Sequence, residues 1–303
     1  MPTGTDQPLA VSTVQAPELR QTVRPAKRFL DWRVVTTRPK IFAHRGASAV
    51  APENTLPAFE KALEMGADGT ELDVQATADG QLVVLHDYNL ERTTTGAGPL
   101  RSHTLAQLAG IDAGIRFDTA FSGTPIPTLE QVFDLVGDSF IVNVEIKNMD
   151  WDGGREPEPL VRLIQRRRLY DQVIVSSFNP IALRRMRQLD PSVPLGLLYF
   201  DRPPHSANGK RSLLQKVRSL PLKDLLLYFC RPWFSRGLAP EALHPYFTSI
   251  NAQLIAKARS RGQQVNAWTV NSGAEARRLA GLGVDAIITD IPDAISKELS
   301  PAE

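Results

Sequence analysis

The chain has 303 residues, with 42% hydrophobic residues, 22% charged residues and a formal net charge of +2. These values are those of an ordinary globular protein that holds one large domain or two small ones. Because the net charge is small and the Lys and Arg residues are scattered, the sequence gives no electrostatic support for nucleic-acid binding.

The cysteine content and the N-terminal sequence indicate the cellular compartment of the protein. The single cysteine, Cys230, excludes an internal disulfide framework and is compatible with a reducing compartment. The N-terminus lacks the basic and apolar regions of a secretory signal. The longest apolar stretch away from the expected strands, Leu225–Cys230, is far shorter than the roughly 20 residues that cross a bilayer. We therefore expect a cytoplasmic protein without a transmembrane segment, for which peripheral lipid contact is not excluded.

The order of expected elements predicts the domain organisation. Residues 1–38 contain scattered prolines without sustained periodicity and are predicted to be a flexible arm. Residues 39–299 are predicted to be one catalytic domain, in which short apolar runs alternate with amphipathic segments. The expected strands are Ile41–Ala43, Thr70–Val74, Phe140–Ile146, Val173–Ser176, Leu195–Phe200, Phe247–Ile250, Gln264–Trp268 and Ala286–Thr289. The expected helices are Thr55–Met65, Thr128–Val136, Pro157–Arg168, Pro180–Leu189, Ala252–Arg261 and Gly273–Leu282.

This alternation predicts parallel βα units, and eight of them suit a TIM-like (β/α)8 barrel. An open, doubly wound sheet fits the same alternation, because sequence alone does not show closure. Two stretches interrupt the rhythm: an insertion at about 87–125, after a hairpin expected around Asp79–Gly80, and a variable segment at about 201–240. Both follow strands, so in a barrel both belong at the C-terminal rim, over the active site.

Three carboxylates stand on two neighbouring expected strands. Glu71 and Asp73 are two residues apart, so both point to one face of their strand, and Glu145 follows on the next. Bare anions that converge in this way are costly to bury, and a hard divalent cation, Mg²⁺ or Ca²⁺, would offset that cost. The alternative is a solvated strand face. The additional residues Glu145 and Lys147 favour a metal site.

Two histidines lie at expected strand ends beside charged groups. His44 and His86 have side chains that exchange protons near neutrality, so together they could serve as acid and base. Arg45 could hold two oxygens of a phosphate, or form a salt bridge at the rim with Glu53. Lys147 could pair with Glu145, or add positive charge at the developing phosphorane oxygens.

These residues belong to a longer ordered series of motifs, and the series resembles the glycerophosphodiester phosphodiesterase family. The motifs cover about residues 40–295 and appear in the order that the family has. They are His44-Arg45-Gly46, Pro52-Glu53-Asn54-Thr55, Glu71-Leu72-Asp73, His86-Asp87, Val144-Glu145-Ile146-Lys147, Ser177-Phe178, Trp268-Thr269-Val270-Asn271, Gly283-Val284-Asp285 and Ile288-Thr289-Asp290-Ile291-Pro292.

The resemblance implies a TIM-barrel hydrolase that cleaves small-molecule glycerophosphodiesters to glycerol 3-phosphate and an alcohol. It implies one divalent metal ion held by Glu71, Asp73 and Glu145, and it implies general acid and base roles for His44 and His86. It also implies that Arg45 and Lys147 contact the phosphate, that Trp268 lines the pocket, and that Glu53 belongs to the same cluster. The insertion matches a small inserted domain of the family that is thought to bear on glycerol selection.

Two alternatives use the same residues. A lysophospholipase D-like activity on acylated glycerophosphodiesters would give a purpose to the apolar region Leu213–Phe234. A non-catalytic phosphodiester-binding barrel is also conceivable, because a fold does not guarantee activity. The intact set of charged motif residues argues against that second alternative. The sequence does not indicate which histidine is the acid, which of the two ions is bound, or the oligomeric state.

Overall fold

A computed structural model describes residues 38–199 and 237–300. The predicted flexible arm at 1–38, apart from its last residue, lies outside the described residues. So do most of the variable segment at 201–240 and the whole of the apolar region Leu213–Phe234.

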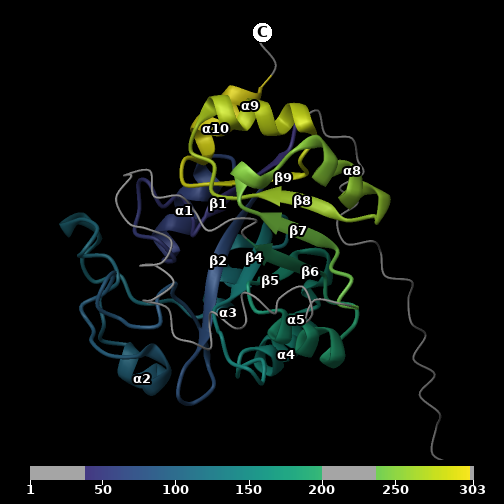
Figure 1. Cartoon of the computed structure of the whole chain (residues 1–303). Coiled ribbons are helices and arrows are strands. Elements are labelled where there is room, and N and C mark those ends of the chain that lie inside the picture. Colours follow the sequence, from purple (N-terminus) through teal and green to yellow (C-terminus); the bar gives the residue numbers. More distant parts are fainter. Residues whose placement is uncertain (1–37, 200–236, 301–303) are drawn as a thin grey trace, which may run out of the picture.

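Eight parallel strands close into a barrel (Figure 1), because β1 pairs with β2 as well as with β9. The strand order is β1-β9-β8-β7-β6-β5-β4-β2, and β3 pairs antiparallel with β2. The predicted barrel is confirmed, and the open sheet is excluded by the β1–β2 pairing. The strands are β1 (Lys40–His44), β2 (Gly69–Ala76), β3 (Leu82–Val84), β4 (Ile141–Ile146), β5 (Val173–Ser177), β6 (Leu195–Tyr199), β7 (Ala242–Pro245), β8 (Gln264–Ala267) and β9 (Ala286–Thr289).

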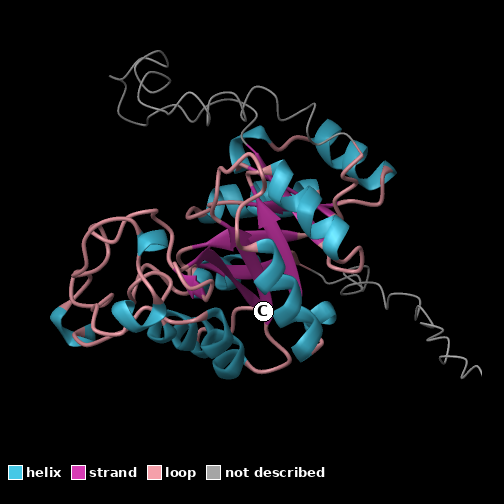
Figure 2. Ribbon diagram, turned by 90° about the horizontal axis from the view of Figure 1, so that it is seen from below, coloured by secondary structure: helices cyan, strands magenta, loops and turns pink. Residues whose placement is uncertain are grey.

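The helices lie around the outside of the strands (Figure 2). They are α1 (Leu56–Glu64), α2 (Leu105–Leu108), α3 (Leu129–Val136), α4 (Pro157–Arg167), α5 (Pro180–Leu189), α8 (Ala252–Ser260), α9 (Gly273–Leu282) and α10 (Pro292–Leu299). Short 3-10 helices cover Leu100–Ser102, Thr119–Phe121, Leu169–Asp171 and Phe247–Ser249. All six predicted helices are present, whereas α2 and α10 were not among those predicted.

Local chemistry explains where several helices begin and end. Before α3, the Thr128 hydroxyl accepts from the backbone N–H of Gln131 and the Gln131 side chain accepts from Thr128, which forms a capping box. Helix α9 ends at Gly283, whose φ of 83° is a left-handed conformation that glycine adopts without steric cost.

One predicted strand is wrong. The sequence predicts a strand at Phe247–Ile250, but the structure has β7 at Ala242–Pro245, and a 3-10 helix follows at Phe247–Ser249. Proline has no N–H to donate to a ladder, which disfavours Pro245 in the interior of a strand. It is tolerated as the last residue of β7, where the ladder ends.

The main core lies between the barrel and its helices. Leu72 and Val74 of β2 pack outward against helix residues such as Phe59 of α1 and Leu129 of α3, and all four are completely buried. Because side chains alternate along a strand, Glu71 and Asp73 therefore point into the barrel. The outward apolar positions thus hold the strand in the register that directs both carboxylates inward.

The insertion forms a small lobe beside the barrel (Figure 1). It has its own cluster of buried side chains, which are Val83, Leu85, Leu90, Leu100, Leu108, Ala113 and Ile126. The lobe therefore has an apolar interior separate from the main core. This interior holds the loops of the lobe together at one side of the barrel.

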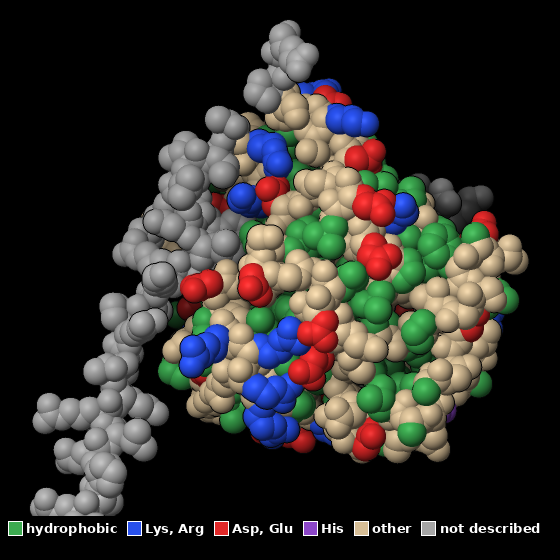
Figure 3. Space-filling model, turned by 180° about the vertical axis from the view of Figure 1, so that it is seen from behind, with side chains coloured by type: hydrophobic (Ala, Val, Ile, Leu, Met, Phe, Trp, Pro, Cys, Tyr) green, Lys and Arg blue, Asp and Glu red, His purple; other side chains and the backbone are tan. Residues whose placement is uncertain are grey.

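The surface is mixed in charge. In Figure 3, Lys and Arg side chains lie interspersed with Asp and Glu on the face shown. No helix in the described part of the chain is long and apolar enough to span a bilayer.

Candidate active site

Three buried carboxylates meet inside the C-terminal end of the barrel. Glu71 and Asp73 come from β2 and Glu145 from β4, and Asp73 stands opposite Glu145 in the strand register. One carboxylate oxygen of each residue lies within 4.8 Å of the others. The three residues are only 4%, 1% and 7% exposed, respectively. The structure thus brings together the three predicted metal ligands.

The electrostatics of this cluster fit a cation. Burial, followed by the charges of Asp73 and Glu145, raises the pKa of Glu71 well above its usual value. Burial also acts against ionisation of Asp73, but Lys147, Arg45 and other neighbours lower its pKa to about 2. Its Oδ1 atom is buried without a hydrogen-bond partner. A buried oxygen without a donor beside two further carboxylates is a ligand set suited to Mg²⁺ or Ca²⁺.

Two basic side chains border the carboxylates. The Nε of Arg45 lies 3.2 Å from Asp73, and its Nη1 donates to Glu53 at 2.9 Å. The Nζ of Lys147 lies 2.9 Å from Glu145 and 3.6 Å from Asp73. Burial opposes the charge of Lys147, but the two carboxylates outweigh burial and raise its pKa. Lys147 therefore stays protonated at neutral pH.

Glu53 connects the site to the insertion through a residue that the sequence analysis did not identify. Arg92 donates to both oxygens of Glu53, at 2.6 and 3.0 Å, and also to Asp87 at 2.5 Å. Arg92 follows the His86-Asp87 motif by five residues, inside an irregular stretch. A basic residue in a loop carries no periodic signal, so only the fold reveals this contact.

His44 stands at the end of β1 and pairs with an aspartate from the other end of the domain. Its Nδ1 lies 2.6 Å from the Oδ1 of Asp290, and its Nε2 lies 3.9 Å from Glu71. The Ser48 hydroxyl and the Asn271 amide also donate to Asp290. Burial opposes ionisation of Asp290, but the hydrogen bond from His44 and these donors lower its pKa to about 2.

His86 follows β3 and has a similar partner. Its Nδ1 lies 2.6 Å from the Oδ1 of Asp87, the next residue in the chain. Burial and then the charge of Lys147 lower the pKa of His86. Burial works against ionisation of Asp87, but hydrogen bonds from Arg92 and His86 lower its pKa to about 2. Each predicted catalytic histidine thus has one ring nitrogen held by an ionised carboxylate.

Trp268 follows β8 and belongs to an aromatic group at the rim. Its ring meets Phe178 and Tyr246 edge-on, each with centroids 5.4 Å apart, and its Nε1 donates to the His244 carbonyl at 2.8 Å. The Nζ of Lys147 lies 6.0 Å from the Phe178 ring. These contacts place Trp268 close to the basic side of the site.

The backbone around the first motif is unusual. Arg45 and Asn54 both have a φ of 59°, a left-handed conformation that is uncommon outside glycine. Gly46 has a φ of 80°, and a Cβ atom there would lie 2.6 Å from the Ala58 backbone. The Asn54 amide donates to Asp73 at 2.8 Å. Asn54 and Asp290 were visible as motif residues, but the sequence did not assign them a role.

Comparison with known proteins agrees with this geometry. Residues 44–294 match the glycerophosphoryl diester phosphodiesterase family. A glycerophosphodiester phosphodiesterase of Caldanaerobacter subterraneus subsp. tengcongensis is 37% identical over 257 residues, which cover 84% of this chain and 95% of the relative. One from Bacillus subtilis is 33% identical, and the match covers 84% of each chain.

The chain belongs to the glycerophosphoryl diester phosphodiesterase family. The resemblance deduced from the motifs is therefore confirmed, and the protein is a phosphoric diester hydrolase. A phosphodiesterase of Oleispira antarctica, solved in complex with the product sn-glycerol-3-phosphate, has a TM-score of 0.70 and 27% identity. The match covers 86% of this chain and 97% of that one.

Proposed function

We propose that this family member hydrolyses glycerophosphodiesters with one divalent metal ion and with His44 and His86 as the proton-transfer groups. The observation that carries the proposal is the meeting of Glu71, Asp73 and Glu145 within 4.8 Å, bordered by basic side chains and both histidines. Relatives of this chain are named glycerophosphodiester phosphodiesterases, which favours this substrate class.

The three carboxylates would hold the metal ion, Mg²⁺ or Ca²⁺. A bound cation supplies Lewis-acid polarisation of the phosphoryl group and lowers the pKa of a bound water or alcohol. The interaction between Asn54 and Asp73 supports this role, because the amide holds one aspartate oxygen and leaves the other without a donor. Such an arrangement keeps a ligand atom oriented toward the cation.

Arg45 and Lys147 would bind the diester phosphate. Both carry positive charge next to the carboxylates, and an arginine fork can bond two phosphate oxygens. Glu53 then acts through Arg45, since it accepts from that guanidinium and from Arg92. Trp268 would form part of the wall that receives one arm of the substrate.

The two histidines would exchange protons through their Nε2 atoms. Asp290 and Asp87 are ionised at neutral pH, so each accepts a hydrogen bond from the Nδ1–H of its histidine. This leaves Nε2 of each ring as the nitrogen that gives or takes a proton. One histidine removes a proton from the attacking group, and the other protonates the leaving alcohol.

The test combines metal removal with substitution. After EDTA treatment, hydrolysis of glycerophosphocholine should cease and return when Mg²⁺ or Ca²⁺ is restored. His44→Ala and His86→Ala should each lower kcat by about 10²- to 10⁴-fold, the usual range for a general acid or base. His103→Ala is the matched control, since His103 lies in the insertion and its ring Nδ1 lies 3.0 Å from the Pro99 carbonyl oxygen.

Two results would contradict the proposal. One is full activity in a protein from which metal has been stripped, measured with a phosphate-free buffer. The other is near-normal turnover in both histidine variants while the proteins remain folded by circular dichroism. Loss of turnover in His103→Ala would instead point to general damage from histidine removal.

The lysophospholipase D-like alternative is tested by comparing glycerophosphocholine with lysophosphatidylcholine. The apolar region that motivated it lies outside the described residues, so no described contact favours it over the deacylated substrate. The comparisons favour an enzyme over the non-catalytic barrel, because the matching relatives carry phosphodiesterase names.

A further inference from the structure

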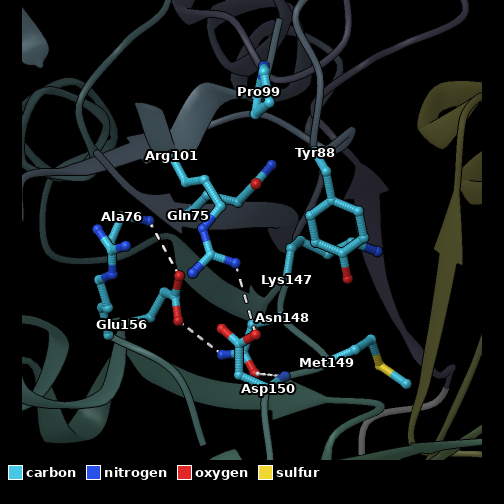
Figure 4. A pocket seen from close by; sticks show the side chains of 11 residues that line it. Gln75, Ala76, Tyr88, Pro99, Arg101, Lys147, Asn148, Met149, Asp150 and Glu156 are labelled. Atoms are coloured by element: carbon cyan, nitrogen blue, oxygen red, sulfur yellow. Dashed lines mark hydrogen bonds and ion pairs between the residues drawn. The ribbon is translucent and has the colours of Figure 1, made fainter. Parts of the chain in front are cut away.

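A cavity opens beside the carboxylate cluster, between the insertion and the barrel (Figure 4). Its volume is about 250 Å³. Its lining comes from the end of β2, from the insertion, and from the segment between β4 and α4. The lining residues that matter here are Tyr88, Arg101, Lys147, Asp150, Arg155 and Glu156.

The cavity is continuous with the proposed phosphate site, because Lys147 belongs to both. Its Nζ lies 2.9 Å from Glu145, one of the proposed metal ligands. Tyr88 comes directly after Asp87, which holds His86, and in Figure 4 it stands beside Lys147. A diester whose phosphate lies at Lys147 can therefore place one of its two alcohol arms in this cavity.

The charges of the lining are unequally compensated. Lys147 is paired with Glu145 and Asp73. Glu156 accepts from the Ala76 backbone N–H at 3.3 Å and from the Asn148 amide at 2.7 Å, so its two oxygens are satisfied by neutral donors.

The two guanidinium groups of the lining have fewer charged partners than Lys147. Arg101 reaches toward Asp150 from the insertion (Figure 4), but the two lie 3.7 Å apart, beyond hydrogen-bond distance. Arg155 is exposed and has no hydrogen bond or ion pair with any residue in 38–199 or 237–300. Among the residues that the structure describes, the cavity thus has one guanidinium without a counter-ion and a second whose carboxylate partner lies beyond hydrogen-bond distance.

A guanidinium group without a charged partner favours an anionic ligand. Its planar fork matches carboxylate and phosphate groups, and hydrogen bonds between ionised partners are stronger than neutral ones. A neutral glycerol arm would leave Arg155 without a counter-charge, and a quaternary ammonium would be repelled by it. An arm that carries its own anionic group would pair with both arginines.

We propose that this cavity, the arginine pocket, binds the second alcohol of the diester and selects alcohols that carry an anionic group. The proposal rests on the proposed function, because it assumes that a phosphodiester is cleaved at the carboxylates. Arg155 and Arg101 are the residues that contact the anionic group. Lys147 marks the boundary between the pocket and the phosphate site.

The test uses two substrates that differ by a single carboxylate, sn-glycero-3-phosphoserine and sn-glycero-3-phosphoethanolamine. The unmodified enzyme, loaded with its metal, should have a kcat/KM about tenfold higher for the serine diester, since one charge-assisted pair is worth roughly that factor. Arg101→Gln/Arg155→Gln should reduce this ratio to about one, and Arg155→Lys should retain part of it.

Arg162→Gln is the matched control, because Arg162 is an exposed arginine of α4 that does not line the pocket. This variant should keep the serine preference. A thermal melt of each variant shows that the ratio is compared among folded proteins.

Two outcomes overturn the proposal, and they are distinguishable. If the unmodified enzyme cleaves both diesters with a ratio near one, or if the double variant keeps the preference, the arginine pocket does not select the alcohol. If the unmodified enzyme cleaves neither diester with either metal, the proposed function fails as well.

Discussion

The two levels of the barrel interior differ in polarity. The level at the C-terminal ends of the strands, here called the mouth, is acidic, and the level below it, here called the floor, is apolar. At the mouth, Glu71, Asp73 and Glu145 crowd three acidic groups into a buried space. The floor is filled by apolar side chains, namely Phe42, Ile141, Ala286 and Ile288. Strand β4 contributes to both, since Ile141 and Glu145 lie on the same face of that strand.

The difference separates stability from function. Burial and like charges raise the pKa of Glu71, so without a cation the mouth works against the folded state. The floor and the outer core stabilise the fold by burying apolar surface. Substitutions at the floor should therefore lower stability, whereas substitutions at the mouth should lower activity. Four experiments test this division.

The largest effect on stability is expected at the floor. Phe42 is completely buried, so Phe42→Ala should lower the free energy of unfolding by about 3 to 5 kcal/mol, the usual range for loss of a buried aromatic ring. Urea denaturation at 25 °C measures this value. The folded fraction should retain its kcat. A stable variant with a large loss of kcat would break the division between floor and mouth.

At the mouth, Glu71→Gln should lower kcat/KM by roughly a thousandfold, because it removes a charge that the proposed metal site requires. The metal-free variant should nevertheless melt about 2 to 4 °C higher than the metal-free parent, since relief of like-charge repulsion near 1 kcal/mol shifts Tm by that amount. Calorimetry in EDTA measures the shift. A lower Tm would mean that Glu71 stabilises the fold even without a cation.

A group of buried polar side chains from β4, β5, β7 and β8 sharpens the comparison. Asn143, Ser176, His244 and Asn266 are completely buried, and each has at least one side-chain atom without a hydrogen-bond partner. The Asn266 amide nitrogen donates to Nε2 of the His244 ring at 3.0 Å. Burial lowers the pKa of His244 to about 3, so the ring is neutral in the folded protein.

This predicts acid sensitivity. Below pH 6.5 the unfolded chain binds a proton at His244 and the folded protein does not, so stability falls as pH falls toward 3. Between pH 7 and pH 4 the loss should be about 3 kcal/mol, at 1.36 kcal/mol per pH unit. His244→Gln should lose less stability over the same range in urea titrations. Equal slopes for the two proteins would show that His244 is not the responsible group.

The smallest effect is expected at Asp290, which orients the His44 ring at the mouth. Asp290→Asn should lower kcat by roughly ten- to a hundredfold and leave KM nearly unchanged, because the amide no longer fixes the His44 tautomer. Asp293→Asn, on the exposed side of α10, should have no such effect. If Asp290→Asn changed only KM, Asp290 would act on the substrate and not through His44.

Much of this protein can be derived from its sequence. The alternation of apolar and amphipathic segments predicts seven of the eight barrel strands and six of the eight described α-helices, because that periodicity reflects which side chains are buried. The spacing of Glu71 and Asp73 directs both carboxylates to one face, which holds whatever the strand packs against. The ordered motifs identify the family without any structure.

Other features depend on contacts between distant parts of the chain. The pairing of β1 with β9 brings Asp290 to His44 across 246 positions of sequence, and the pairing of β1 with β2 completes the closed barrel. Arg92 of the insertion reaches Glu53, and Arg155 enters a cavity that the insertion helps to form. Periodicity records whether one residue is buried, whereas these contacts depend on where the fold brings a second residue, so only the tertiary structure decides them.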